Sequence, residues 1–248
     1  MLLDVLFGSA PITPGVVAGR VVAVIDVLRA STTITAALAN GARKVVPLED
    51  ADAVMTRAKQ FERVDVRTAG ERKMMPIPGF DLGNSPREMT REAVEGKTVL
   101  MTTTNGTGAL LAIQGARDVV IASYVNCGAV TTLLRAAARG GCDISIACAG
   151  RDRQFSLEDA ACAGRLVRAV SKQTPRVELG DGAFAATVLD RKYGDRLDQL
   201  FADSEHGQAL VEAGLGADLE ACAAVDAHPV IPIYQDRQVT LLGPDRER

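Results

Sequence analysis

The sequence predicts an α/β fold in which helices cover both faces of a mixed sheet, a three-layer α/β/α-type arrangement. Short β-branched runs alternate along the chain with Ala- and Leu-rich segments at helical spacing. The runs Val21–Ile25 ("VVAVI") and Ile144–Cys148 ("ISIAC") are apolar on both faces, which is typical of strands covered by helices on both sides. These observations favour one α/β unit and leave open whether it contains two similar subdomains.

Five strand-and-helix pairs carry this prediction. They are Val21–Asp26 with Thr32–Asn40, Lys44–Leu48 with Asp50–Phe61, Thr98–Thr102 with Thr107–Gln114, Asp118–Ser123 with Ala129–Arg139, and Asp143–Ala147 with Leu157–Ser171. Gly41 suits the position just after a helix, and Asp50 and Ser156 suit N-cap positions. The prolines and glycines of Met74–Pro86 predict an ordered loop, and Gly180–Asp218 is expected to be helical and charged.

Length and charge bound the class of protein. With 248 residues we expect a single compact catalytic domain over 1–248, closed by a strand at Val230–Tyr234, with any subdomain boundary near 124–128. The 28 basic and 31 acidic residues give a net charge of −3 without a polybasic run, which argues against nucleic-acid and membrane partners. No secretory leader pattern or apolar run of about 18 residues is present, so we expect a soluble cytoplasmic protein. Homo-oligomerisation is left open.

Cysteine and histidine usage restricts the metal chemistry. The five cysteines are scattered without a CxxC pair, which argues against a disulfide framework and a zinc knuckle. Histidine is found only at 206 and 228, so any bound metal must be held mostly by oxygen.

The turn after the first of these strands combines an acid, a base and hydroxyls. Arg29 provides a planar fork suited to phosphate or sulfonate, and Thr32 lies at a helix start that favours negative charge. Asp26 would repel an anion unless it holds a metal that binds the anion. The alternative is that Ser31 or Thr32 is a plain N-cap and Arg29 a surface residue.

A second turn, within Val99–Leu111 ("VLMTTTNGTGALL"), resembles an anion-binding loop. Its polar and glycine residues are Thr103, Thr104, Asn105, Gly106 and Thr107. Glycine allows close backbone approach, and successive N–H groups form a nest for an anion. No lysine follows the glycines as in a P-loop, so a small anion is favoured over a nucleotide, with an elaborate helix cap as the alternative.

The third turn follows the strand that ends at Cys148. Glu158 and Asp159 in a helical first turn complement the helix dipole, yet beside Arg151 they would also supply oxygen ligands for Mg²⁺. A cysteine phosphatase loop requires an arginine six residues after the cysteine, and Gln154 occupies that position. A thiol nucleophile is therefore disfavoured.

A loop and one histidine complete the set of candidates. The loop candidates, in Ala69–Thr90, are Glu71, Arg72, Asp81, Asn84 and Ser85. Ordered loops on a rigid scaffold often carry binding groups, although Ser85 is equally suited to begin a helix. We interpret His206 as structural or exposed rather than catalytic.

Five segments in this order carry a family resemblance. They are "DVLRASTTI", "GERKMMPIPGFDLGNSPREMT", "TTTNGTGAL", "CAGRDRQFSLEDAACAG" and "SEHGQAL". From about Asp4 to Tyr234 the chain resembles the 2-phosphosulfolactate phosphatase (ComB) family, with Ser31 standing where that family's pattern has threonine. The resemblance implies an α/β fold and Mg²⁺-dependent hydrolysis of 2-phospho-3-sulfolactate to 3-sulfolactate and phosphate, on the route toward coenzyme M.

The resemblance also gives the candidate residues their expected roles. The implied substrate carries a phosphate, a carboxylate and a sulfonate, and phosphoryl transfer requires neutralised charge and a positioned water. The expected catalytic residues are Asp26, Asp81 and Glu158, and the expected Mg²⁺ ligands are Asp26, Asp81, Glu158 and Asp159, ahead of Glu71. The expected substrate-binding residues are Arg29, Thr32, Arg72, Asn84, Ser85, Thr103, Thr104, Asn105, Gly106, Thr107 and Arg151.

The sequence leaves two mechanisms open, and it leaves two rival functions beside the hydrolysis of 2-phospho-3-sulfolactate. An aspartyl-phosphate at Asp26 would need a second acid two residues on, where Leu28 stands, so direct attack by water is favoured. A carboxylate that is not bound to the metal would take the proton of that water. The rival functions are a phosphatase for another small 2-phospho-carboxylate and a non-catalytic protein that binds a small polyanion.

Overall fold

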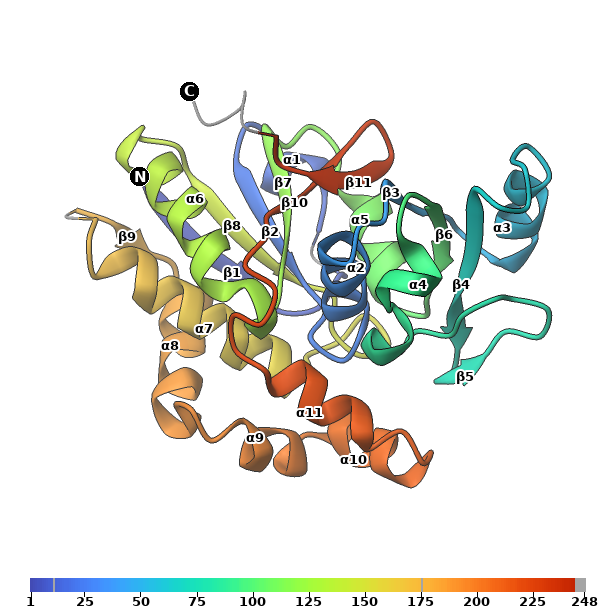
Figure 1. Cartoon of the computed structure of the whole chain (residues 1–248). Helices are drawn as coiled ribbons and strands as arrows, with labels where there is room; N and C mark the ends of the chain where they lie inside the picture. The colour runs from blue at the N-terminus through green and yellow to red at the C-terminus, as the bar shows by residue number, and fades with distance from the viewer. Residues whose placement is uncertain (11, 175, 244–248) are drawn as a thin grey trace.

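The computed structural model describes residues 1–10, 12–174 and 176–243, which form a layered arrangement of strands and helices (Figure 1). The strands are β1 (Leu2–Leu6), β2 (Val21–Ile25), β3 (Lys44–Pro47), β4 (Val66–Arg72), β5 (Met75–Pro76), β6 (Thr98–Thr102), β7 (Asp118–Ala122), β8 (Ile144–Cys148), β9 (Glu178–Leu179), β10 (Pro232–Gln235) and β11 (Gln238–Leu241). The helices are α1 (Pro14–Val17), α2 (Ala30–Ala39), α3 (Ala51–Ala58), α4 (Arg91–Val94), α5 (Gly106–Ala112), α6 (Cys127–Arg139), α7 (Leu157–Ser171), α8 (Asp181–Tyr193), α9 (Leu197–Asp203), α10 (Glu205–Glu212) and α11 (Ala217–Ala223). Two 3₁₀ turns are η1 (Pro86–Glu88) and η2 (Tyr124–Asn126).

Two blocks of parallel strands make up one sheet, and a hairpin joins them. The order is β5-β4-β6-β3-β11-β10-β7-β2-β8-β1-β9, with β4, β6 and β3 parallel on one side and β7, β2, β8, β1 and β9 parallel on the other. The β10–β11 hairpin pairs antiparallel with β7 through Ile233 and Val120, and with β3 through Val239 and Val45. The sheet is therefore mixed, as predicted.

Helices cover both faces of this sheet, which confirms the three-layer prediction. The side chains of Val21, Ala23 and Ile25 in β2 belong to one buried core together with residues of α6, α7 and α8. Those of Val22 and Val24 belong to a second core together with residues of α2 and α5. Every residue of β2 is consequently buried, because neighbouring side chains on a strand point to opposite faces.

Most predicted elements lie where the sequence placed them. The strand Thr98–Thr102 and the helix Leu157–Ser171 match residue for residue, and Asp50 caps α3 by accepting the N–H of Ala53 at 2.8 Å. Strands β1 and β4 were not predicted, and β4 takes in the first residues of the expected Ala69–Thr90 loop. Residues 124–128 form η2 and the start of α6, and the division into subdomains stays a prediction.

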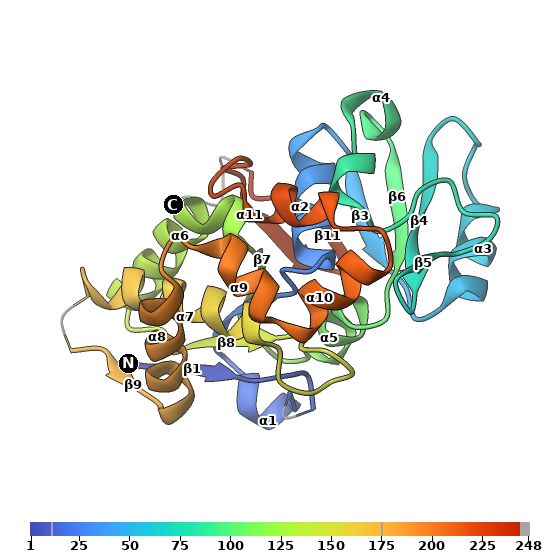
Figure 2. The same cartoon turned by 90° about the horizontal axis from the view of Figure 1, so that it is seen from below.

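The C-terminal helices lie across one end of the sheet. Helices α10 and α11 lie below the sheet in Figure 1 and in front of it in Figure 2, near the loops that follow β4 and β8. Within the described residues, no helix has the length and apolar character needed to span a bilayer.

Gly164 allows α7 and α8 to pack closely, because a Cβ atom at this position would lie 2.0 Å from the carbonyl oxygen of Ala186. We expect Gly164→Ala to lower the free energy of unfolding by about 1–3 kcal/mol, since the helices must separate. Gly15→Ala in α1 is the control, because a Cβ atom there meets nothing within 4 Å. Urea unfolding measures both variants, and equal stabilities would contradict the close helix contact.

Candidate active site

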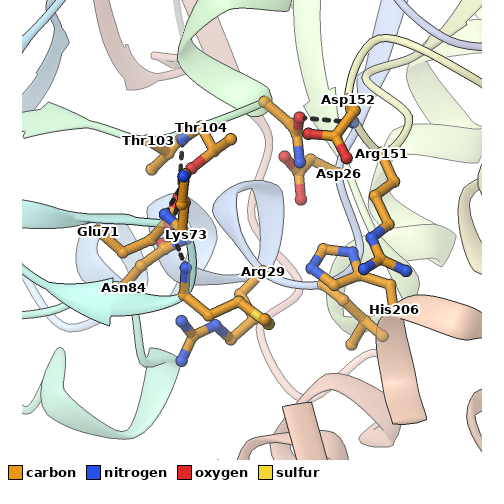
Figure 3. A pocket seen from close by; sticks show the side chains of 13 residues that line it. Asp26, Arg29, Glu71, Lys73, Asn84, Thr103, Thr104, Arg151, Asp152 and His206 are labelled. Atoms are coloured by element: carbon orange, nitrogen blue, oxygen red, sulfur yellow. Dashed lines mark hydrogen bonds between the residues drawn. The ribbon is translucent and has the colours of Figure 1, made fainter. Parts of the chain in front are cut away.

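Loops that follow four strands, together with helix α10, line one pocket of about 230 Å³ (Figure 3). Asp26 follows β2, Glu71 lies at the end of β4, Thr103 follows β6, Arg151 follows β8, and His206 projects from α10. The full lining is Asp26, Leu28, Arg29, Glu71, Lys73, Met74, Asn84, Thr103, Thr104, Asn105, Arg151, Asp152 and His206. Ligand sites at the carboxyl ends of parallel strands are the rule in α/β proteins.

Asp26 is a buried carboxyl group at the floor of this pocket. It is 5% exposed, and its Oδ1 accepts the N–H of Ala30 at 3.2 Å. The pKa of Asp26 is raised to about 6: burial is the main cause and the nearby carboxylates of Glu71 and Glu158 add to it, while His206 and the Ala30 N–H oppose the increase. A buried carboxylate of this kind favours a cationic partner, and the functional role of Asp26 stays a prediction.

Helix α5 approaches Asp26 closely because Gly106 has no side chain. A Cβ atom at Gly106 would lie 2.7 Å from Asp26 Oδ2 and 2.5 Å from the Cβ of Ala30. Within the same turn the N–H of Thr103 donates to Thr107 Oγ1 at 3.0 Å, and the N–H of Thr107 donates to Thr103 Oγ1 at 3.1 Å. Thr107 therefore shapes the turn without lining the pocket, whereas Thr103, like Thr104 and Asn105, does line it.

Arg29 lines the pocket, but its charge is already compensated. Its Nη1 lies 2.6 Å from Asp218 Oδ2, and the Ser85 hydroxyl donates to Asp218 Oδ1 at 2.6 Å. All three side chains are buried. Asp218 of α11 was not predicted, and Ser85 supports Arg29 through it rather than lining the pocket.

Thr32 and Arg72, both expected to bind substrate, do not line the pocket. The Thr32 hydroxyl donates to the carbonyl of Val27 at 2.9 Å and lies 2.7 Å from Ser123 Oγ, which makes it part of the buried base of α2. Arg72 is exposed, with its Nη2 3.5 Å from Thr102 Oγ1. We leave both residues out of the proposed substrate contacts.

Glu71 joins the end of β4 to the threonine turn. Its carboxylate accepts the N–H groups of Thr104 and Met74, each at 2.7 Å, and the Thr104 hydroxyl at 3.0 Å. Lys73 lines the pocket close to Glu71 and was not predicted from the sequence. Its backbone N–H donates to Thr104 Oγ1 at 3.2 Å. Glu71, which the sequence analysis ranked below the other expected Mg²⁺ ligands, therefore lines the pocket.

Asn84 lines the pocket and carries a buried side-chain oxygen that is not used in a hydrogen bond among the described residues. The residue is 5% exposed, and its Oδ1 is buried without a hydrogen-bond partner among the described residues. Its backbone carbonyl accepts the hydroxyl of Thr33 at 2.9 Å, which fixes the residue against α2. A buried amide oxygen without a donor is energetically unfavourable unless a ligand, water or metal satisfies it.

Three of the four expected metal ligands, Asp81, Asp159 and Glu158, do not line the pocket. Asp81 lies in a separate depression, where its Oδ2 accepts Arg63 Nη1 and the N–H of Thr68, each at 2.8 Å. The hydrogen bond from Arg63 holds the pKa of Asp81 well below its usual range, so this acid is a structural anion. Both the catalytic and the metal role expected for Asp81 are therefore withdrawn.

Asp159 is likewise occupied by the backbone. Its Oδ1 accepts the N–H of Val27 at 2.8 Å and its Oδ2 accepts the N–H of Gly150 at 3.1 Å, which ties the β2 and β8 turns together. Burial raises the pKa of Asp159 well above its ordinary value, and the charges of Glu158 and Asp26 raise it further. Asp159 does not line the pocket, and we withdraw it as a metal ligand.

Glu158 lies behind His206 instead of lining the pocket. It is 1% exposed, and its Oε1 lies 3.3 Å from His206 Nδ1. The sequence favours a structural or exposed role for His206, because a lone histidine is more often so than catalytic, and the structure places it at the pocket. The "SEHGQAL" segment was the one signal that could have found it.

Cationic side chains lie on opposite sides of Asp26, Lys73 on one side and Arg151 on the other (Figure 3). Arg151 Nη1 lies 3.4 Å from Glu205 Oε2, an exposed pair of little energetic weight. Cys148 is fully buried, does not line the pocket, and has a pKa raised well above its ordinary value by burial, which agrees with its exclusion as a nucleophile.

The oxygen donors at the pocket are compatible with Mg²⁺, but they are fewer than the four carboxylates predicted from the sequence. Among the described residues, no group of three or more His, Cys, Asp or Glu side chains is placed to hold a metal ion. Mg²⁺ commonly needs only one or two carboxylates and completes its shell with substrate oxygens and water. The Asp26 carboxylate and the unsatisfied Asn84 Oδ1 are hard oxygen donors at one pocket, with Glu71 beside them.

Fold and pocket together define a class: an α/β protein whose strand-end loops form one small polar pocket with an acid between cations. A family model described as 2-phosphosulpholactate phosphatase matches residues 12–237. The chain belongs to this 2-phosphosulpholactate phosphatase family, which confirms the resemblance.

Named relatives agree with the family model. A protein of Symbiobacterium thermophilum named "Probable 2-phosphosulfolactate phosphatase" is 44% identical over 225 residues, 91% of this chain and 95% of its own. Relatives with the same name from Thermotoga petrophila and Clostridium botulinum are 37% and 34% identical and cover 93% and 98% of this chain, and 94% and 100% of their own. All three relatives carry the name of a phosphoric monoester hydrolase.

The Arg29–Asp218 pair predicts a large loss of stability when one partner is removed. Asp218→Ala should lower the free energy of unfolding by about 3–5 kcal/mol, because it leaves a buried guanidinium without its anion. The double variant Arg29→Met/Asp218→Leu should recover most of this loss, since no buried charge remains. Urea unfolding measures both, and a loss below about 1 kcal/mol in Asp218→Ala would contradict a buried, paired Arg29.

Asp26 predicts a specific pH dependence of stability. Its folded-state pKa of about 6 lies above the ordinary value of 3.8, so the folded protein binds this proton more tightly than the unfolded chain does. The wild type should therefore lose stability relative to Asp26→Asn as the pH rises from about 4 to about 6, by on the order of 2–3 kcal/mol in all. Urea unfolding in EDTA across this range tests the prediction, and a difference independent of pH would contradict it.

Proposed function

We propose that this protein is a Mg²⁺-dependent phosphatase that hydrolyses 2-phospho-3-sulfolactate to 3-sulfolactate and phosphate. The observation that carries the proposal is the buried Asp26 carboxyl in one pocket with Arg29, Lys73 and Arg151. Family membership supports the phosphatase class and this substrate. Roles in coenzyme M biosynthesis, a cytoplasmic location and homo-oligomerisation stay predictions.

The charges of the pocket suit a small polyanion. The substrate has three anionic groups, and the pocket offers two cations, Lys73 and Arg151, whose charge no buried acid compensates among the described residues. Arg29, neutralised by Asp218, contributes directed N–H groups rather than net charge. We assign the carboxylate and the sulfonate to Lys73 and Arg151, on either side of the phosphate above Asp26.

Asp26 and Asn84, with Glu71 beside them, are the residues that would hold Mg²⁺. Bound there, the ion would neutralise charge on the phosphoryl oxygens. The chain's own residues bind and orient the ester: Lys73 and Arg151 fix its flanking anions, and the buried Leu28 excludes water from one wall. We retain direct attack by water over an aspartyl-phosphate, because Leu28 occupies the position of the second acid.

Activity assays separate this proposal from its rivals. The wild type should release phosphate from 2-phospho-3-sulfolactate with Mg²⁺ and lose this activity in EDTA. A preference for 2-phospholactate in kcat/KM would favour the phosphatase for another 2-phospho-carboxylate, because a site built for the sulfonate discriminates against analogues that leave its cations unpaired. Binding without turnover would favour the non-catalytic protein.

Asp26 and Asp81 give opposite expectations in the same assay. Asp26→Asn should lower kcat by at least about 10²-fold, because it removes the carboxylate at the centre of the pocket. Asp81→Asn is the matched control and should keep kcat within about threefold, since Asp81 lies outside the pocket. Steady-state phosphate release measures both, and equal losses would contradict the assignment of the site.

A further inference from the structure

His206 forms part of the wall between two cavities. It is the second residue of α10, is 13% exposed, and lines the active-site pocket. It also lines an adjoining cavity of about 260 Å³, which shares Arg151 with the first. The imidazole of His206 projects from α10 into the pocket (Figure 3). One face of the side chain can thus serve the substrate while the other communicates with a separate space.

The carboxylate of Glu158 faces this imidazole, and its buried Oε1 has no hydrogen-bond partner among the described residues. Its Oε1 lies 3.3 Å from His206 Nδ1, and the carboxyl group is 1% exposed. Burial acts to raise the pKa of Glu158, but the interaction with His206 outweighs it and the pKa is lowered. Glu158 is therefore an anion that faces Nδ1, which leaves Nε2 as the nitrogen for the pocket.

The start of α10 holds His206 in place. Ser204 caps the helix, and its Oγ accepts the N–H of Gly207 at 2.9 Å. A Cβ atom at Gly207 would lie 2.0 Å from the carbonyl oxygen of Phe201, so only glycine permits this approach of α10 to α9. His206 thus stands on a capped, closely packed helical turn rather than on a free loop.

The chemistry of the proposed substrate calls for a proton donor in the active-site pocket. The ester oxygen of 2-phospho-3-sulfolactate leaves as an alkoxide, a strong base that departs slowly unless it is protonated during bond breaking. We propose that His206 Nε2 donates this proton as the general acid of the reaction and that Glu158 is its positioning residue. This inference rests on the proposed phosphatase function.

The proposed step balances in atoms and charge. The oxygen of a water molecule bonds to phosphorus while the bond from phosphorus to the ester oxygen breaks and leaves its electron pair on that oxygen. The ester oxygen takes the proton of the His206 imidazolium and departs as the alcohol. Both protons of the water leave with the dihydrogen phosphate, which returns one of them to His206, so this step does not use the carboxylate base expected from the sequence. The second cavity gives the imidazole an alternative route for this proton exchange.

Two substrates that differ in their leaving group test the proposal. p-Nitrophenolate is a weak base that leaves unprotonated, so p-nitrophenyl phosphate does not need a general acid. His206→Asn should lower kcat for 2-phospho-3-sulfolactate by about 10²–10⁴-fold and that for p-nitrophenyl phosphate by less than about tenfold. His206→Gln should give the same split, and circular dichroism checks that both variants fold.

Glu158→Gln should show the same split with a smaller loss on the alkyl ester. Because Glu158 acts through His206, the double variant should be no slower than His206→Asn alone. His228→Asn and Glu212→Gln are the controls, since both residues lie outside the two cavities, and both should keep wild-type rates on the two substrates.

Equal losses of His206→Asn on both substrates would overturn the role of His206 as general acid. A further loss when Glu158→Gln is added to His206→Asn would overturn the positioning role of Glu158. A wild type that hydrolyses neither substrate would instead contradict the proposed phosphatase function itself, so the two failures are distinguishable.

Discussion

The rest of the site depends on one constraint, a carboxyl group buried at the end of a strand that is itself buried on both faces. Asp26 follows β2, where burial raises its pKa to about 6 and where α5 approaches so closely that only Gly106 fits. An ionised carboxylate in such a place is unfavourable alone. The pocket around it has cationic side chains, Lys73 and Arg151, on either side. A bound metal would neutralise the Asp26 carboxylate, and a bound polyanion would neutralise the two cations.

Most acids near this pocket serve to hold its walls rather than to react. Asp218 compensates Arg29, Glu71 fixes the threonine turn, and Asp159 joins the β2 and β8 turns through two backbone N–H groups. Glu158 faces His206 in the same supporting way. The site is thus a set of cations and one central acid, surrounded by buried acidic side chains that each contact a specific partner.

Local pattern was sufficient for the layers and for the position of Asp26 at the end of a buried strand, and insufficient for partners brought from far along the chain. The alternation of strands and helices located β6 and α7 residue for residue. His206 and Asp218 lie in α10 and α11. These helices pack over the strand ends through tertiary contacts, which a local sequence pattern does not predict. Asp81 is a plausible metal ligand from its loop sequence alone, but in the fold its carboxylate is paired with Arg63. β1 was missed because it pairs in parallel with β8, a strand far along the chain, as in the pairing of Leu3 with Ile144.

A crystal structure with Mg²⁺ and inorganic phosphate tests the central claim most directly. The account predicts one ion bound by Asp26 Oδ2 and Asn84 Oδ1 at about 2.0–2.1 Å, with a phosphate oxygen in its shell. An ion held by Asp81 or Asp159, or phosphate bound away from Asp26, would contradict the account.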